Sequence, residues 1–102
     1  VDVEAPHRCA ASVEATAYFV VAEALTNVAR HSGARSATVT VRSDGDRLRL
    51  RVTDDGKGGA DEAAGTGLAG MRHRVEAYDG VFSLRSPVGG PTTCEVDLPC
   101  GS

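Results

Sequence analysis

Residues 37–58, ATVTVRSDGDRLRLRVTDDGKG, contain the pattern that decides the fold. Apolar and polar residues alternate through 37–42 and again through 47–52, and such alternation predicts strands that are buried on one face. Between them, Asp44-Gly45-Asp46 is a hairpin signal. The stretch therefore predicts two antiparallel strands, and the polar, glycine-rich residues after them predict a loop.

Two helices and three further strands are expected outside this hairpin. The helices fall at 9–31 and 67–78, and the strands fall at 1–4, 81–85 and 92–98. Ser32-Gly33 ends the first helix, and a glycine-rich loop over 55–66 precedes the second. This order predicts an α+β two-layer sandwich, in which helices cover one face of a mixed, mostly antiparallel sheet.

The composition indicates one small domain. The chain has 102 residues, of which 41% are hydrophobic and 25% are charged, and its net charge is −3. We expect residues 1–102 to form a single domain, excised or processed from a longer chain because the sequence does not begin with Met. Its negative charge and 4% aromatic content argue against nucleic acid as a partner. No signal peptide or membrane-spanning run is present, so we expect a cytoplasmic domain without membrane contact.

The cysteines show no pattern of a functional site. Cys9, Cys94 and Cys100 have no paired C-x-x-C spacing, and no His is placed to complete a zinc site with them. An odd number of widely spaced cysteines favours small thiols in a reducing cytosol. We therefore expect all three as free thiols.

A line of polar residues follows the first predicted helix. Its members occupy positions i, i+4, i+7 and i+8 and therefore share one narrow face: Glu23, Asn27, Arg30 and His31. This line is either a solvated helix face or a binding face. Asn is a poor residue for an exposed helix interior. A carboxylate, an amide and two cations suit a metal ion that bridges a polyphosphate.

Strand parity singles out one of two neighbouring carboxylates. In the strand that begins at Arg47, Asp54 continues the inward series, whereas Asp55 points the other way or into the loop. A carboxylate aimed at the core needs a hydrogen-bond donor. Asp54 either caps the backbone at Gly56 or accepts from an exocyclic amine such as that of adenine, with the glycines allowing a flat base to lie against backbone.

The last predicted strand supports the second interpretation. Thr92 has the inward parity of that strand and stands at its start, whereas Asp54 stands at the end of its own strand. Antiparallel neighbours would bring the two side chains together at one end of the sheet. There an acid and a hydroxyl, with a water between, can read one edge of a base.

Residues 65–72, GTGLAGMR, match the dinucleotide pattern G-x-G-x-x-G. A Rossmann site requires a buried strand before that pattern, and a polar loop stands there instead. A Walker A site is also excluded, because Gly56-Lys57-Gly58 lacks the following Ser or Thr and the spacing. Glycines that open a helix still expose its first N–H groups, which predicts phosphate binding by another route.

Four motifs, taken in order, resemble the GHKL (Bergerat-fold) ATPases. They are Glu23-x-x-x-Asn27-x-x-Arg30-His31, Asp54-x-Gly56-x-Gly58, Gly65-x-Gly67-Leu68-x-Gly70-Met71-Arg72 and Gly89-Gly90-Pro91-Thr92. The chain is most similar to the catalytic ATP-binding domain of bacterial sensor histidine kinases, in the subclass with a short lid and no F box that pairs with nitrate- and desaturase-type response regulators. The resemblance covers nearly the whole chain. It departs at Pro91, where the family has a third glycine.

The resemblance implies ATP and Mg²⁺ as cofactors and gives each matching residue a role. The implied adenine contacts are Asp54, Gly56, Gly58 and Thr92. The implied phosphate and lid contacts are Arg30, His31, Gly65, Thr66, Gly67, Leu68 and Gly70. Asn27 is the implied Mg²⁺ ligand, and Glu23 is implied to orient the water around the metal or to polarise the acceptor.

The implied reaction transfers the γ-phosphoryl group of ATP to a histidine. In the family that histidine lies on a dimerising helix before an acidic residue, and none of His7, His31 and His73 has such a neighbour. The implied partners are therefore a separate dimerisation domain of the same kinase and a cognate response regulator, and we expect this piece to be monomeric. The alternatives are an anti-sigma-factor-type serine kinase and a docking pseudo-kinase module that binds no nucleotide.

Overall fold

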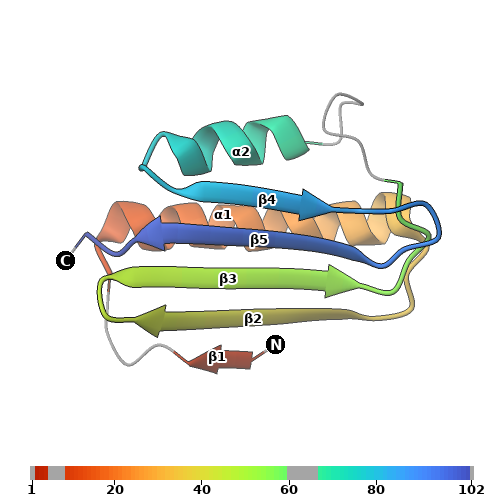
Figure 1. The fold of residues 1–102 in the computed structure, drawn as a ribbon, viewed down its shortest axis with the longest axis horizontal. Helices are drawn as coiled ribbons and strands as arrows, with labels where there is room; N and C mark the ends of the chain where they lie inside the picture. Colours follow the sequence, from red (N-terminus) through yellow and green to blue (C-terminus); the bar gives the residue numbers. More distant parts are fainter. Residues whose placement is uncertain (1, 5–8, 60–66, 102) are drawn as a thin grey trace.

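The computed structural model describes residues 2–4, 9–59 and 67–101, with the backbone alone for residues 2–4, 31, 32 and 44. Five strands form one sheet in the order β1-β2-β3-β5-β4 (Figure 1). The strands are β1 (Asp2–Glu4), β2 (Ala37–Asp44), β3 (Arg47–Asp54), β4 (Val81–Arg85) and β5 (Thr92–Pro99). β1 pairs with β2 in parallel, and the other neighbours are antiparallel. The predicted α+β fold with a mixed, mostly antiparallel sheet is confirmed.

Two α-helices, α1 (Ala11–Asn27) and α2 (Leu68–Glu76), pack on the inward face of the sheet. The alternation of β3 buries Leu48, Leu50 and Val52, while its arginines stay outside. In register with them, β5 buries Cys94, Val96 and Leu98. The helices cover these residues with side chains such as Val20 and Met71, both fully buried. Burial of each large apolar side chain contributes on the order of 1.5–3 kcal/mol, so this shared core fixes the helices on the sheet.

The outward face of the sheet is a ladder of opposite charges. Arg47 and Arg49 lie 2.7 and 3.4 Å from the two carboxylate oxygens of Asp97, and Arg51 lies 3.7 Å from Glu95. These side chains are partly or largely exposed. Exposed ion pairs stabilise a protein weakly. We therefore interpret this face as a solvated surface.

The first helix is shorter than the sequence predicts. The α-helix ends at Asn27 and continues as a π-helical turn, η1 (Val28–Ser32), which Gly33 closes at φ 66°. The predicted stop at Ser32-Gly33 is thus confirmed, but the last five residues are wound more loosely than an α-helix. No helix in the described ranges is both long and apolar enough to cross a bilayer.

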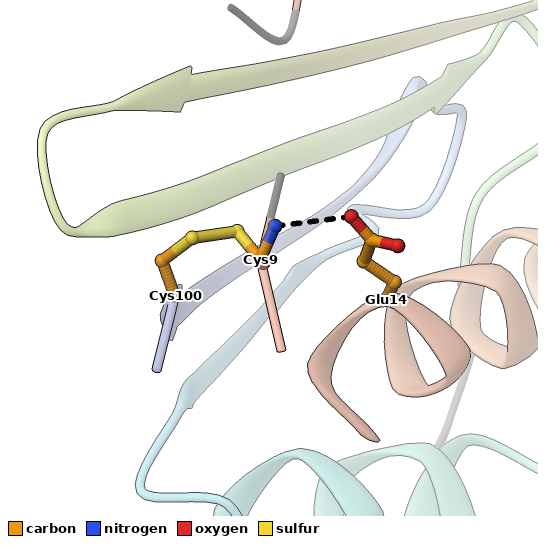
Figure 2. Close-up of a disulfide and its surroundings, with 3 residues drawn as sticks. All are labelled: Cys9, Glu14 and Cys100. Atoms are coloured by element: carbon orange, nitrogen blue, oxygen red, sulfur yellow. Dashed lines mark hydrogen bonds between the residues drawn. A yellow bond between two sulfur atoms is a disulfide. The ribbon is translucent and has the colours of Figure 1, made fainter. Parts of the chain in front are cut away.

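The prediction of three free thiols is wrong for two of them. Cys9 and Cys100 form a disulfide across 91 positions of sequence (Figure 2). Cys94 is buried and is not part of a disulfide. The fold brings the pair together by placing the end of β5 against the start of α1. There the Ala10 N–H donates to the Cys100 carbonyl at 2.9 Å. Because this contact depends on sheet order, residue spacing carried no sign of it.

Candidate functional site

The described elements that carry the predicted site residues meet at one end of the sheet, at the right of Figure 1. β3 and β4 end there, β5 and α2 begin there, and the C-terminal end of α1 lies behind them. Asp54 and Thr92 face each other directly in the register of β3 and β5. The predicted meeting of these two residues is confirmed.

Asp54 is buried, with 5% of its surface exposed. Its Oδ1 accepts a hydrogen bond of 2.8 Å from the Gly56 N–H, so the backbone-capping interpretation is confirmed. One backbone donor occupies one lone pair of a group that can accept about four hydrogen bonds. The cap orients the carboxylate and leaves it with acceptor capacity for a ligand.

Ser86 is a site residue that the sequence analysis missed. Its Oγ lies 2.7 Å from Oγ1 of Thr92, and its carbonyl accepts the Gly59 N–H at 2.8 Å. It follows β4 directly, and Arg85 pairs with Thr93. Continuing this register places Ser86 opposite Thr92, where cross-strand Ser and Thr hydroxyls commonly pair, but the predicted bounds of the two strands did not set the register. Ser86 therefore holds the Thr92 hydroxyl and the glycine loop in one place.

Two loops at this end pack backbone against backbone. The Gly89 N–H donates to the Lys57 carbonyl at 2.7 Å. A Cβ on Gly58 would overlap the Pro87 carbonyl oxygen, and a Cβ on Gly90 would overlap the Gly56 carbonyl oxygen. Close approach of the two loops therefore requires glycine at both positions. This is a requirement of the fold itself, in addition to any contact with a ligand.

Asp55 turns away from the site, as parity predicts. Its Oδ1 accepts the backbone N–H groups of Arg35 and Ser36 at 2.9 and 3.1 Å, and its Oδ2 accepts from the Ser36 hydroxyl at 3.2 Å. The hydrogen bond from the Ser36 backbone is the main cause that holds the pKa of Asp55 below its ordinary value of 3.8. Asp55 thus anchors the segment that leads into β2.

The lowered pKa of Asp55 gives a prediction for acid stability. A carboxyl whose pKa is lower in the folded state stabilises the fold above its unfolded pKa, and this contribution is lost as the pH falls through the folded value. We expect Asp55→Asn to be less stable than the wild type at pH 7 and to lose less stability below about pH 4. Urea unfolding at a series of pH values measures this. Ser36→Ala, which removes only the side-chain bond, should keep most of the wild-type pH dependence, and parallel curves for wild type and Asp55→Asn would contradict the assignment.

Helix α1 brings Glu23 and Asn27 to the same end of the molecule. Both are half-buried, and they lie one helical turn apart. The Nδ2 of Asn27 is buried and has no hydrogen-bond partner in the described part of the chain. An unpartnered buried donor costs about 1–3 kcal/mol, so its retention points to an acceptor that a ligand supplies. Arg30 is exposed in η1, and the side chain of His31 lies outside the described residues.

Helix α2 begins beside Glu23. Gly67 precedes the helix at φ 85°, and a Cβ there would lie 3.0 Å from Oε2 of Glu23. The first hydrogen bond of the helix runs from the Met71 N–H to the Gly67 carbonyl at 3.0 Å. The N–H groups of residues 68–70 therefore have no acceptor within the helix. Leu68 is buried and anchors the turn, whereas Gly70 is exposed and a Cβ on it would meet no atom within 4 Å. Gly65 and Thr66 lie outside the described residues.

The described residues hold no cluster of three or more His, Cys, Asp or Glu side chains that could bind a metal ion. The described side chains at this end of the sheet therefore do not form a complete metal site by themselves. Mg²⁺ bound together with a polyphosphate needs only one or two protein oxygens, because phosphates and waters complete its shell. The amide oxygen of Asn27 and the carboxylate of Glu23 fit that requirement.

Comparison with known proteins agrees with this geometry. Residues 12–102 match the model of the histidine kinase-, DNA gyrase B- and HSP90-like ATPases. The sensor histidine kinase YxjM of Bacillus subtilis is 37% identical over 90 residues, which cover 86% of this chain and 22% of that protein. The sensor histidine kinase NarS of Mycobacterium tuberculosis is 34% identical over 105 residues, which cover 96% of this chain and 24% of that protein. The chain thus spans about a quarter or less of the length of these two relatives.

A solved structure shares both the fold and part of the sequence. The ATP-binding domain of PrrB from Mycobacterium tuberculosis superposes with a TM-score of 0.71 at 25% identity, over 100% of this chain and 82% of that one. The motifs, the end of the sheet where they meet and the match over residues 12–102 agree. This chain belongs to the family of histidine kinase-, DNA gyrase B- and HSP90-like ATPases.

Proposed function

We propose that the domain binds Mg-ATP at the end of the sheet formed by β3 and β5, and that it is the ATP-binding catalytic domain of a sensor histidine kinase. Its reaction delivers the γ-phosphoryl group to a histidine on a separate dimerisation domain of the same kinase. The Nδ2 of Asn27 carries this proposal, because it is buried without a hydrogen-bond partner in the described part of the chain and, as a donor, fits an acceptor such as a phosphate oxygen. It lies on α1 at the end of the fold where Asp54 faces Thr92, so the same end offers polar groups for a base and for phosphates.

The adenine end of the site is built from β3 and β5. The carboxylate of Asp54 accepts from the exocyclic amine of the base, and the Thr92 hydroxyl supports the same edge through water. Gly56 shapes this end because its N–H fixes the Asp54 carboxylate. Gly58 allows the 56–59 loop to pack closely against the 87–90 turn. Burial of Asp54 makes this contact selective, because a base with an oxygen in place of the amine would face the carboxylate with an acceptor.

The phosphate end is built from the helix termini. The N–H groups that follow Gly67 have no acceptor within α2 and favour negative charge, and the bare surface of Gly70 leaves room for phosphate oxygens. The amide oxygen of Asn27 would ligate Mg²⁺, and Glu23 would orient the water around it. Bound Mg²⁺ supplies positive charge that offsets the charge developing on the transferred group. The proposed phosphate and lid segment also includes Arg30, His31, Gly65, Thr66 and Leu68.

The remaining partners follow from the kinase assignment. Two relatives that the chain matches are sensor histidine kinases, and the chain spans 22% and 24% of their lengths. The acceptor histidine and the dimerising helices would therefore lie in another part of such a protein, and a response regulator would take the phosphoryl group from there. We place this domain in the cytoplasm, where ATP and the regulator are found, and assign it to the subclass with a short lid.

Calorimetric titration with ATP and ADP, with Mg²⁺ and with a chelator, tests the proposal. We expect both nucleotides to bind, and Mg²⁺ to strengthen the binding of ATP. In Asn27→Ala the gain in affinity on adding Mg²⁺ should fall by about tenfold or more. The free energy of unfolding should stay within about 1 kcal/mol of the wild type, because the variant also removes an unpartnered buried donor.

Thr26→Ala is the matched control for Asn27→Ala. Thr26 is exposed on the same helix, and its hydroxyl donates to the Ala22 carbonyl at 2.9 Å. This variant should bind Mg-ATP as the wild type does. An Asn27→Ala domain that keeps the full Mg²⁺ dependence would remove Asn27 from the metal site. A folded wild type that binds neither nucleotide would contradict the function itself.

A further inference from the structure

The Cys9–Cys100 disulfide lies at the opposite end of the sheet from the candidate nucleotide site. Cys100 follows β5, whereas Thr92 begins it, and Cys9 precedes α1, whereas Asn27 ends it. An α-helix of 17 residues is about 25 Å long. The bond therefore joins the two ends of the described domain, the entry to α1 and the exit from β5, at a distance from the residues proposed to bind ATP.

Three hydrogen bonds position the two cysteines independently of the bond between their sulfur atoms, and one of them joins the two cysteine segments directly. The Cys9 N–H donates to Oε2 of Glu14 at 3.0 Å, as Figure 2 shows. The Ala10 N–H donates to the Cys100 carbonyl at 2.9 Å, and the Cys100 N–H donates to the Asp46 carbonyl at 2.6 Å. These three contacts would survive reduction, and two thiols kept side by side can form the bond again.

Disulfides are rare in a reducing cytosol, and those that do occur are usually transient or redox-sensing. We propose that Cys9 and Cys100 form a reversible redox site, whose reactants are low-molecular-weight thiols and their disulfides. Oxidation links the start of α1 covalently to the end of β5, and reduction removes that link. The proposal takes the cytoplasmic location from the proposed function, and otherwise it rests on the bond and its surroundings and not on the nucleotide site.

The reaction is thiol–disulfide exchange, and it balances without another oxidant. A thiolate RS⁻ attacks Sγ of Cys9, the residue with the larger exposed fraction, 9% against 1% for Cys100. The S–S bond breaks, and Cys100 leaves as a thiolate. A second RS⁻ then attacks the outer sulfur of the mixed disulfide, which forms RSSR and releases Cys9 as a thiolate. The pair gains two electrons and two protons, and two RSH become one RSSR; oxidation is the reverse.

Counting thiols tests the bond itself. After equilibration with oxidised glutathione, the domain is denatured without reductant and alkylated, and its mass is measured. In the oxidised sample we expect one labelled cysteine, Cys94. In a sample treated with dithiothreitol before alkylation we expect three. Three labels in the oxidised sample would overturn the proposal.

Thermal unfolding tests what the bond does. Reduction should lower Tm by at least about 8 °C, because the bond closes a loop of more than 90 residues in the unfolded chain. Renewed oxidised glutathione should restore the original Tm. An unchanged Tm, or a reduced domain that does not form the bond again, would show that no reversible site exists.

Variants assign the effect to the pair. Cys9→Ser and Cys100→Ser should each show the low Tm and no response to dithiothreitol. Cys94→Ala should keep the full shift between oxidised and reduced forms, and loss of the shift in that variant would overturn the assignment. If a serine variant does not fold, the thiol count and the thermal unfolding of the wild type decide alone. None of these measurements needs a nucleotide, so failure of the proposed ATP site would not be mistaken for failure of the redox site.

Discussion

Asp54→Asn should weaken ATP binding by about 10- to 150-fold, which is the loss of one charged hydrogen bond of about 1.5–3 kcal/mol. Asn keeps an oxygen that can accept from Gly56, so the loop is not released. The other carboxylate oxygen becomes an NH₂ group, which turns a donor toward the amine of the base. Calorimetric titration with ATP measures the loss.

Asp55→Asn is the matched control, because it makes the same chemical change at the next residue. Asp55 bonds Arg35 and Ser36 and points away from the site. This variant should bind ATP with an affinity within about threefold of the wild type at pH 7. A moderate fall in the free energy of unfolding still leaves the domain folded under these conditions. If both variants lose affinity equally, the loop conformation and not the Asp54 carboxylate governs binding.

Gly58→Ala should destabilise the domain by about 2–5 kcal/mol. Two causes add: the new Cβ would overlap the Pro87 carbonyl, and the φ of 67° at this position is costly for any residue with a side chain. A backbone carbonyl cannot move aside as a side chain can, so the two loops must separate. Since small domains have only about 5–15 kcal/mol of stability, denaturant unfolding should detect the change readily.

Gly70→Ala is the contrasting glycine variant. Gly70 is exposed within α2, its φ is ordinary and a Cβ there meets no atom within 4 Å. Alanine should therefore stabilise the domain by about 0.5–1 kcal/mol, because it favours the helix. A Gly58→Ala domain as stable as the wild type would show that the 56–59 and 87–90 loops are not packed as described.

The fold and much of the site were predictable because their signals are local. Alternation over 37–52 predicted both strands of the hairpin, and parity alone placed Asp54 inward and opposite Thr92. Those inferences require only neighbouring residues and the period of a strand. The roles of Asp54 and Thr92 toward a base remain predictions.

The features that the sequence analysis missed depend on distant parts of the chain. The Cys9–Cys100 bond needs the end of β5 to lie against α1, and residue types do not show that contact. The π-helical turn after Asn27 has a sequence that fits an α-helix equally well. The glycine at position 58 was attributed to a ligand, whereas the structure also gives it a neighbouring loop.

The lengths of the strands bear on how the domain meets other copies of itself. In the described part of the chain the two edge strands are the shortest, with three residues in β1 and five in β4, against eight in each of β2, β3 and β5. An unpaired edge is a template for adding another strand, and a short edge offers few free backbone groups. The described edge strands therefore offer few free backbone groups for extension of this sheet by a second molecule. We expect the domain to stay soluble at high concentration, and any association to use side-chain surfaces.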